Sequence, residues 1–383
     1  MKEGVAIVGI GVTGFTSVSP SLSFKEITYS AAVKAYSEAG LSPKDIDSFI
    51  TASEDFMEGY SIFDEYVPDQ LGAVLRPVQT VTADFLQALG IGYMMINTGR
   101  FRTIAIEAHS KSSNIKTLDE VQSFALDPVY LRPLKENSTF LAGLEMKRFL
   151  KDSGNTEEQC AHVVIKNKKN ALYNTNAAYG ANLTVDDILS SQPISLPLKH
   201  LDVAEPADGA IVVVLASHNE AKALCKNPIW IKGIAWFSGQ GNPWSRNLCS
   251  ADYATLAARK AFAMAGITNP IKEIDFAEVC DEYSYKELQH LESMGIVRKG
   301  EAGFLTENGA TGLDGILPVN VSGGSLGVGH TFEASGGMKT YEAVLQLRNQ
   351  AGKRQIKDAR VGLVQSWRGI PTATGAVAIL SNE

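Results

Sequence analysis

The sequence is poor in cysteine, and its cysteines are scattered. Only four of the 383 residues are cysteine, with no CxxC pair and no histidine at metal-ligand spacing, and they are Cys160, Cys225, Cys249 and Cys280. This pattern predicts neither a metal site nor a disulfide framework. The first three are interpreted as small buried apolar residues, whereas Cys280 belongs to a motif described below.

Long apolar runs and clusters of basic residues are also missing. No apolar run approaches the length of about 20 residues that crosses a bilayer. No run is rich in lysine and arginine, and the net charge is −7 with a pI near 5.5. Binding to nucleic acid or to an anionic membrane needs clustered cations, so neither is expected. The N-terminal residues lack a cleavable signal pattern, and together these absences predict a cytoplasmic protein.

What is present is an ordinary globular composition and an internal repeat. Apolar residues make up 45% and charged residues 20%, values typical of a chain that buries a large core. Residues 31–40 (AAVKAYSEAG) recur at 257–266 (AARKAFAMAG) with six of ten positions identical. Each copy predicts an alanine-rich helix that ends at a glycine C-cap. The copies are too far apart for a solenoid, so they indicate duplication of a whole half of the chain.

The repeat divides the chain into an N-terminal half, residues 1–225, and a C-terminal half, residues 226–383. In each half a strand-like segment leads into a helix, then a strand, and a continuous apolar strand closes the half. The segments are 78–81, 84–98, 103–106 and 209–216 in the first half, and 318–321, 335–349, 361–364 and 375–380 in the second. Continuous apolar strands are typical of covered sheets, so we expect an α/β fold of two βαβ-rich halves. Residues from about 118 to 200 are more polar and are expected to form an insertion packed over the first half.

A first glycine-rich motif lies near the N-terminus. Residues 9–14 (GIGVTG) match the GxGxxG pattern of dinucleotide-binding turns. Such a turn opens a helix directly, but residues 15–23 are rich in serine and contain Pro20. We therefore interpret the motif as the glycine-rich end of a strand and expect no nicotinamide or flavin cofactor.

A second glycine-rich segment carries a histidine. Residues 320–336 (NVSGGSLGVGHTFEASG) place His330 shortly before a predicted helix. Such a backbone folds tightly and can hold an imidazole in a confined pocket, where it moves protons near neutral pH. A histidine on a surface loop is the plain alternative. A P-loop is excluded because no Gly-Lys-Ser/Thr follows.

Four segments together resemble the thiolase superfamily. Residues 320–336 resemble its NxxGGxxxxGHPxGAxG signature, with Thr331 in place of the proline, and residues 205–210 (EPADGA) resemble its SDGAAA segment. Residues 157–178 resemble its EEQ…KN..NA stretch, and residues 278–283 (EVCDEY) look like the ExHDAF segment of the sterol-carrier and archaeal thiolase branch. With the duplication, the resemblance extends over essentially the whole chain.

The resemblance implies a fold, a chemistry and partners. The fold is the five-layer αβαβα thiolase fold, in a homodimer or a dimer of dimers. The chemistry is acyl transfer between coenzyme A thioesters with formation or cleavage of a carbon–carbon bond, with coenzyme A as co-substrate and no covalently bound cofactor. Members of this branch often associate with a small protein of zinc-ribbon and OB fold that helps to hold coenzyme A, so such a partner is expected.

The resemblance also assigns candidate catalytic positions. His330 falls on the histidine that activates the nucleophile and helps to polarise a thioester oxygen. Aligning residues 78–84 (VQTVTAD) with VExACAS places Thr82 at the nucleophilic cysteine. Cys280 takes the position of the His or Asn of the oxygen hole. Gly369, in QSWRG where many members have Cys-x-Gly, is expected to offer a backbone N–H to an oxyanion.

Thr82 leaves several routes open. A hydroxyl is weakly nucleophilic until a base removes its proton, so an acyl-enzyme at Thr82 depends on His330. The second route is direct transfer or a relocated thiol such as Cys280, and the third is a pocket without thiolase turnover. The structural interpretation of Thr82 is a helix N-cap.

Two functions therefore compete at the level of sequence. The first is a thiolase-like acyltransferase acting on a β-ketoacyl-CoA or related thioester. Phe85, Phe332 and Trp367 then line a pocket for a bulky or aryl acyl group, unless they pack in the core. The second is a catalytically silent subunit that keeps the coenzyme A site and assembles with an active partner.

Overall fold

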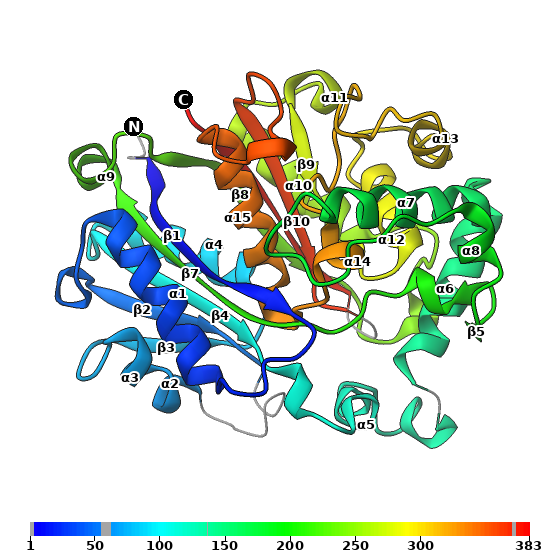
Figure 1. Ribbon diagram of the computed structural model, residues 1–383, viewed down its shortest axis with the longest axis horizontal. Helices are drawn as coiled ribbons and strands as arrows, with labels where there is room; N and C mark the ends of the chain where they lie inside the picture. The colour runs from blue at the N-terminus through cyan, green and yellow to red at the C-terminus, as the bar shows by residue number, and fades with distance from the viewer. Residues whose placement is uncertain (1–3, 55–62, 136, 370–372) are drawn as a thin grey trace.

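A long mixed β-sheet joins the two halves of the chain (Figure 1). The computed structural model describes residues 4–54, 63–135, 137–369 and 373–383. Residues 1–3, the start of the N-terminal segment that was predicted to lack a signal pattern, lie outside these ranges. The strands within these ranges are β1 (Val5–Thr16), β2 (Ser48–Ala52), β3 (Val78–Val81), β4 (Thr103–Ser110), β5 (Pro193–Ser195), β6 (Leu198–Lys199), β7 (Asp208–Ser217), β8 (Ile229–Ser238), β9 (Phe276–Glu278), β10 (Val361–Trp367) and β11 (Thr374–Ser381). Nine of them form the main sheet in the order β3-β2-β4-β7-β1-β8-β11-β10-β9, and β5 pairs with β6.

The main sheet consists of two parts that meet at one narrow junction. Five strands, β3 to β1 in the sheet order, come from the first part of the chain, and four, β8 to β9, come from the second. The junction between β1 and β8 is an antiparallel pairing of Ala6 with Trp230 and Ile7 with Ile229. Each part of the sheet is contacted by its own outer helix.

Fifteen α-helices lie in the described ranges. The longer ones are α1 (Phe24–Ala39), α4 (Phe85–Asn97), α6 (Ser138–Ser153), α7 (Glu157–Ala171), α10 (Asp252–Ala265), α12 (Ser284–Ser293) and α15 (Ser335–Leu347). The shorter ones are α2 (Phe63–Tyr66), α3 (Pro68–Leu71), α5 (Leu118–Ser123), α8 (Val185–Leu189), α9 (His218–Leu224), α11 (Pro270–Glu273), α13 (Ala302–Glu307) and α14 (Gly324–Val328). None is long and apolar enough to span a bilayer.

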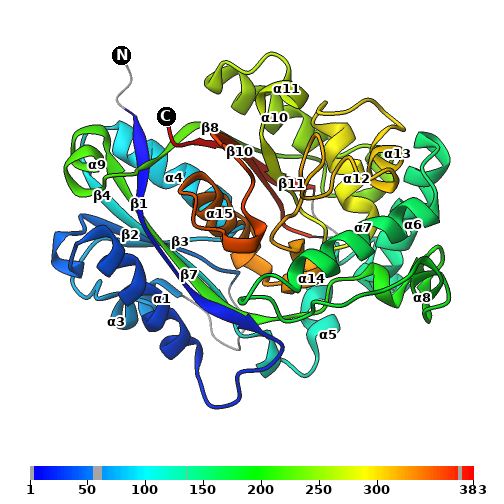
Figure 2. The same cartoon turned by 45° about the horizontal axis from the view of Figure 1, so that its top comes forward.

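The helices and the two sheet parts form five layers. α1 packs on β1 and β7, and α10 packs on β8 and β11, so these two helices cover the outer faces. α4 and α15 contact each other and strands of both sheet parts, and Figure 2 shows them between β1 and β7 on one side and β10 and β11 on the other. This α, β, α, β, α arrangement confirms the expected α/β fold class.

The central helix α4 is apolar on nearly all sides, which is typical of a helix covered on every face. Two of its glycines let neighbouring side chains come close. A Cβ atom at Gly90 would lie 2.5 Å from the Trp236 ring, and one at Gly92 would lie 2.8 Å from the Ile106 side chain. α4 can therefore pack against strands of both sheet parts.

The repeated helices α1 and α10 end as the sequence predicts. Gly40 and Gly266 stand at their C-caps with φ of 65° and 75°. The GxGxxG motif lies wholly inside β1, so it forms no dinucleotide-binding turn. A Cβ atom at Gly11 would lie 2.2 Å from the carbonyl oxygen of Ala31, which shows that the glycines let α1 approach the strand closely.

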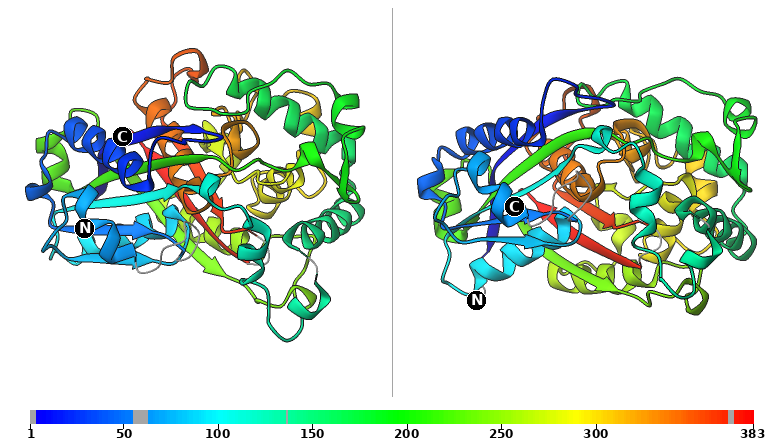
Figure 3. Two further views of the ribbon diagram at one scale, coloured as in Figure 1. Left: turned by 60° about the horizontal axis from the view of Figure 1, so that its bottom comes forward. Right: turned by 90° about the horizontal axis from the view of Figure 1, so that it is seen from below.

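Two expectations about the arrangement of segments were wrong. Residues 318–321 do not form a strand but a single parallel bridge between Val319 and Ala277, because Asn320 adopts φ of 52° and ends the extended run. The main helices of the segment 118–200 do not pack over the first half. Its helices α6 and α7 contact α12, α13 and α14, where their apolar faces share one core with that region, and Figure 3 shows the segment at the opposite end of the molecule from α1.

Candidate active site

The glycine-rich loop of residues 320–330 is fastened to the segment that follows β9. The Asp281 carboxylate accepts hydrogen bonds from the backbone N–H groups of Ser325 (2.6 Å) and Leu326 (3.1 Å), in the first turn of α14. A Cβ atom at Gly324 would lie 2.0 Å from this carboxylate, so only glycine fits at that position. Asp281 therefore fixes the shape of the loop.

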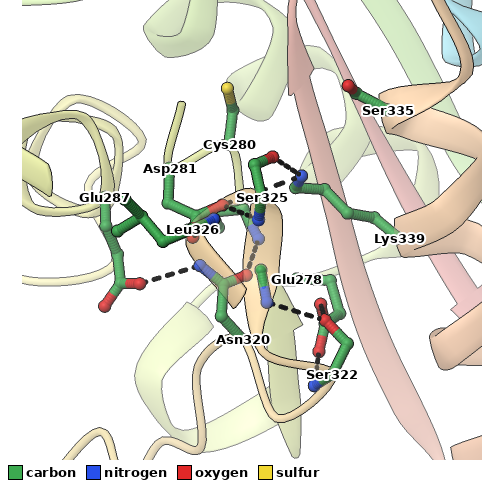
Figure 4. A network of polar contacts seen from close by, with 12 residues as sticks. Glu278, Cys280, Asp281, Glu287, Asn320, Ser322, Ser325, Leu326, Ser335 and Lys339 are labelled. Carbon is green, nitrogen blue, oxygen red and sulfur yellow. Dashed lines mark hydrogen bonds and ion pairs between the residues drawn. The ribbon is translucent and has the colours of Figure 1, made fainter. Parts of the chain in front are cut away.

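Two further residues tie the same two segments together (Figure 4). The Asn320 side chain accepts a hydrogen bond from the Val279 N–H at 2.8 Å and donates one to Glu287 at 2.7 Å. Glu278 accepts from both the N–H (3.0 Å) and the hydroxyl (2.5 Å) of Ser322. These bonds replace the strand pairing that Asn320 interrupts.

A buried lysine balances the charge beneath the loop. Lys339, on α15, donates to the Ser325 hydroxyl at 2.9 Å and lies 3.8 Å from the Asp281 carboxylate. Both charged side chains are wholly buried. A buried charge is tolerated only when it is paired and hydrogen-bonded, so this network holds the loop in one arrangement.

His330 leaves this loop as a buried, neutral side chain. Its backbone N–H donates to the carbonyl oxygen of Glu205 at 2.8 Å, and its carbonyl oxygen accepts from the Ala207 N–H at 2.9 Å. Burial, and secondarily the positive charge of Lys339, lower the pKa of His330 to about 3. Its Nδ1 atom is buried and has no hydrogen-bond partner within the described residues. His330 is therefore not the surface-loop histidine that the sequence left open.

Glu282 is the side chain that faces the imidazole. Its Oε1 atom lies 3.7 Å from Nε2 of His330, just beyond hydrogen-bond distance, and its Oε2 atom is buried with no partner in the described part of the chain. Burial raises the pKa of Glu282 to about 7, although Lys286 and Lys339 act to lower it. A Cβ atom at Gly369 would lie 3.3 Å from Oε2, so the segment after β10 closes against the same carboxyl.

Cys280 is held by its backbone two residues before Glu282. Its N–H donates to Gln365 at 2.8 Å, and its carbonyl oxygen lies 3.1 Å from Nδ1 of His290. Because a carbonyl oxygen can only accept, Nδ1 of His290 is the donor in this contact. Nε2 of the same neutral ring therefore accepts a hydrogen bond from the Tyr253 hydroxyl at 2.9 Å. Burial raises the pKa of the Cys280 thiol to about 12. A thiol that keeps its proton at neutral pH is a poor nucleophile.

Thr82 is exposed on the turn between β3 and α4, and the N-cap interpretation of this residue was wrong. The N-cap is Asp84, whose carboxylate accepts hydrogen bonds from the N–H groups of Leu86 and Gly336, each at 2.9 Å. Asp84 forms a capping box with Gln87, a pattern that favours it over threonine at this helix start. The positive end of the α4 dipole is therefore satisfied by a carboxylate.

A small cavity connects these segments. It has a volume of about 30 Å³ and is lined by Glu54, Asp84, Phe332, Glu333 and Arg368. Arg368 forms an ion pair with Glu54 across its rim. The turn before α4, the loop after His330 and the end of β10 thus meet in one place.

The three aromatic candidates do not share one environment. The Phe332 ring lies 4.3 Å from the His330 ring, measured between centroids, and lines the small cavity. Phe85 is wholly buried among apolar side chains, and the Trp367 ring lies under the Lys286 ammonium at 4.0 Å. Phe85 and Trp367 therefore pack in the interior, which is the core-packing alternative given for them in the sequence analysis.

Sequence reasoning singled out most of the segments that meet here but overlooked one side chain. The structure brings the segments of His330, Cys280 and Gly369 together, and Thr82 stands two residues before a lining residue of the small cavity. Glu282 was not singled out. The sequence did contain one indication, because Glu282 is charged where the ExHDAF segment has alanine. That difference draws attention only once the structure shows Glu282 buried beside His330.

Comparisons with known proteins extend over the whole chain. A family profile described as "Thiolase C-terminal domain-like" matches residues 245–382. The chain is 30% identical to the acetyl-CoA acetyltransferase of Methanothermobacter thermautotrophicus, over 98% of this chain and 99% of that protein. It is 27% identical to the 17-hydroxy-3-oxo-4-pregnene-20-carboxyl-CoA lyase of Mycobacterium tuberculosis, over 96% of this chain and 97% of the lyase.

Solved structures agree with this result. The Ltp2-ChsH2(DUF35) aldolase superposes with a TM-score of 0.84 and 25% identity, over 99% of this chain and 97% of that chain. Human mitochondrial 3-ketoacyl-CoA thiolase shares the fold, with a TM-score of 0.74 and 16% identity over 99% of this chain and 98% of its own. The chain belongs to the thiolase superfamily.

Proposed function

We propose that this protein makes or breaks a carbon–carbon bond next to the carbonyl group of an acyl-CoA, without an acyl-enzyme intermediate. The names of its relatives include an acetyltransferase, a lyase and an aldolase, which all fit bond chemistry at this carbon. Aldol-type cleavage of a β-hydroxyacyl-CoA needs a base for the hydroxyl proton and donors for the enolate oxygen, but no nucleophile. The substrate that fits best is therefore a β-hydroxyacyl-CoA.

The observation that carries this proposal is that neither candidate nucleophile is activated. The Cys280 thiol is buried with its pKa raised to about 12, so it stays protonated at neutral pH. Thr82 is exposed, and the N-terminus of α4 behind it is capped by Asp84. A hydroxyl needs an adjacent base to attack a thioester, and the imidazole of His330 faces Glu282 instead.

His330 is proposed to stabilise the enolate oxygen. A neutral imidazole donates one hydrogen bond and keeps its proton, as an electrophilic donor at an enolate should. The lowered pKa of His330 fits this role, and its Nδ1, which has no partner among the described residues, leaves room for a further polar contact. Gly369 keeps its proposed role as an oxyanion N–H donor, supported by its place against Glu282.

The proposed acyl group is less sharply defined. A bulky or aryl group is supported by Phe332 alone, because Phe85 and Trp367 pack in the interior. The cavity of about 30 Å³ beside Phe332 holds about one water molecule, so an acyl chain has to displace this side chain or the Arg368–Glu54 pair.

We also propose a homodimer and a small partner protein. β3 is the last strand of the main sheet, and such an edge offers free backbone groups to a second copy. The expected zinc-ribbon and OB-fold partner is supported by the aldolase neighbour, whose description names a second, DUF35 component. The alternative function, a silent subunit in such a complex, is favoured by Thr82 at the position of the nucleophile. A cytoplasmic location remains a proposal.

The test is product analysis. The purified chain is incubated with a β-hydroxyacyl-CoA, or with a β-ketoacyl-CoA plus coenzyme A, and shortened acyl-CoA and carbonyl products are followed by mass spectrometry. We expect cleavage of the β-hydroxyacyl-CoA, and a loss of about 100-fold or more in His330→Ala, since an oxyanion donor is worth that much. His200→Ala, at an exposed histidine, is the matched control.

Three other outcomes are informative. Thiolysis of the β-ketoacyl-CoA with an acyl–protein adduct would replace this proposal with the acyltransferase function that the sequence suggested. Cleavage that is unaffected in His330→Ala would remove the histidine from the mechanism. No cleavage by the chain, alone or with proteins that co-purify from the native host, would favour the silent subunit.

A further inference from the structure

We propose that Glu282 is the catalytic acid–base residue of this site, taking the proton from the β-hydroxyl group of the substrate and returning it to the α-carbon of the product. This inference rests on the proposed function and names the group that moves the proton. It concerns a side chain that the thiolase resemblance does not assign, since the ExHDAF segment has alanine at this position.

The geometry around Glu282 supports this role. The side chain is 9% exposed, yet Oε2 has no hydrogen-bond partner among the described residues. Nδ1 of His330, on the facing ring, is buried and unpartnered in the same way. Leaving a buried polar atom unpaired costs about 1–3 kcal/mol, so two of them on neighbouring side chains indicate a place built for a polar group that arrives from outside.

Neighbouring segments direct Glu282 toward this place. Oε1 lies 3.7 Å from Nε2 of His330, and the backbone of Gly369 stands against Oε2. Any side chain at position 369 would enter this space, and φ of 98° there strongly favours glycine. The carboxyl group is thus enclosed by the two segments that also supply the proposed oxyanion donors.

The charges that face Glu282 set its protonation. Lys286 and Lys339 favour the carboxylate, whereas Asp281 and burial favour the neutral acid, and burial is the largest of these effects. The resulting pKa of about 7 lets the group accept and release a proton near neutral pH. His330, which stays neutral, neither adds a charge nor competes for the proton.

The step balances without a co-reactant. The Glu282 carboxylate takes the hydroxyl proton, the oxygen electrons form the carbonyl double bond, and the Cα–Cβ bond breaks. The electron pair of that bond becomes the enolate of the shortened acyl-CoA, whose oxygen His330 stabilises. Protonated Glu282 then delivers the proton to Cα, which regenerates the carboxylate and releases a carbonyl product and an acyl-CoA.

The test measures the reverse of the final proton delivery, in which the Glu282 carboxylate removes a proton from Cα of an acyl-CoA. The full chain is incubated with acetyl-CoA or propionyl-CoA in deuterated water, and deuterium at Cα is measured by NMR, while binding is measured separately by calorimetry. We expect the wild type to exchange the α-proton faster as the pH rises through about 7. Glu282→Gln should lower exchange by about 100-fold or more, and Glu282→Asp should restore part of it.

A matched control is available on the next helix. Glu292 is another carboxyl whose pKa is raised by burial, and it lies about 12 Å along α12 from the first residue of that helix, Ser284. Glu292→Gln should leave exchange and its pH dependence unchanged. Melting curves of each variant show that a loss of exchange is not a loss of folding.

The outcomes separate this inference from the proposed function. Equal exchange in wild type and Glu282→Gln would overturn the role of Glu282 and leave the proposed function standing. Binding of acyl-CoA without exchange in the wild type would overturn the role of Glu282 and favour the silent subunit. Absence of both binding and exchange would overturn the role of Glu282 together with the proposed function.

Discussion

Nε2 of His330 lies 3.7 Å from Oε1 of Glu282, with both side chains buried. The two residues are far apart in the sequence and are brought together because Asp281 ties the start of α14 to the segment after β9. Under the proposed function, this histidine–carboxyl pair serves proton transfer and not attack on a thioester.

Glu282→Gln should stabilise the protein at alkaline pH. The pKa of Glu282 is about 7 in the folded chain and 4.5 for the free side chain. A carboxyl with a raised pKa contributes stability that is fully present below about pH 4.5 and is lost as the pH rises through about 7. At about pH 8 the variant should therefore be more stable by up to about 3 kcal/mol, and at about pH 5 by less than about 1 kcal/mol.

Urea denaturation at the two pH values measures this difference. Glu120→Gln, at an exposed position on α5, is the control and should show no such pH dependence. A Glu282→Gln variant that is less stable than wild type at both pH values would mean that the carboxylate is structurally required.

Gly324→Ala should destabilise the protein far more than Gly40→Ala. Both glycines have positive φ, 59° and 65°, so alanine pays a similar backbone strain of about 1 kcal/mol at each. At Gly40 nothing lies within 4 Å of the new Cβ atom, whereas at Gly324 it would meet the Asp281 carboxylate at 2.0 Å. We expect an extra loss of about 2 kcal/mol or more in the free energy of unfolding at Gly324.

Thermal or urea denaturation of the two variants compares these costs directly. Gly324→Ala should also lower acyl-CoA turnover, because the loop that carries His330 has to move. Equal stability losses at Gly40 and Gly324 would show that Asp281 does not hold the loop.

Asp281→Asn should weaken the attachment of the glycine-rich loop without changing the size of the side chain at position 281. The amide can replace only one carboxylate oxygen, so one of the N–H groups of Ser325 and Leu326 loses its acceptor, and Lys339 loses its nearest negative charge. We expect a loss of about 2–4 kcal/mol in the free energy of unfolding. Asp252→Asn, at an exposed position, should change it by less than about 0.5 kcal/mol. A neutral effect of Asp281→Asn in denaturation experiments would contradict the role assigned to this network.

Thr82→Ala should keep most of the turnover. If no acyl group passes through position 82, loss of the hydroxyl should change the rate of β-hydroxyacyl-CoA cleavage by no more than about threefold, a ΔΔG‡ below about 1 kcal/mol. Thr82→Cys should likewise form no acyl adduct, since the α4 N-terminus is capped by Asp84. A loss of about 100-fold in steady-state rate for Thr82→Ala would assign the nucleophile to the threonine.

Most elements of the fold could be predicted from sequence pattern. The strand-like segment at 78–81 and the helix expected at 84–98 are found as Val78–Val81 and Phe85–Asn97. Residues 318–321 misled the prediction because the bonds of the Asn320 side chain, to Val279 and Glu287, are tertiary contacts. The packing of the 118–200 segment was missed because it also depends on tertiary contacts. The polarity of a segment does not indicate which part of the molecule it packs against.

The segments of the candidate site could be singled out from sequence, but the arrangement of their side chains could not. The glycine pattern leads to His330, and the motif around Cys280 leads to the facing segment. The capping box from Asp84 to Gln87 was legible in the sequence and would have corrected the role of Thr82. The proposed role of Glu282 depends on its burial and on the absence of a partner for Oε2 within the described part of the chain, and no spacing along the sequence reveals either.

The central claim, that carbon–carbon chemistry proceeds here without an acyl-enzyme, is tested most directly by the intact mass of the protein during turnover. The chain is mixed with a β-hydroxyacyl-CoA that it cleaves, quenched in acid at successive times, and weighed by mass spectrometry. We predict an unmodified mass at every time while products accumulate. A transient increase equal to the acyl group, lost on Thr82→Ala or Cys280→Ala, would contradict the account.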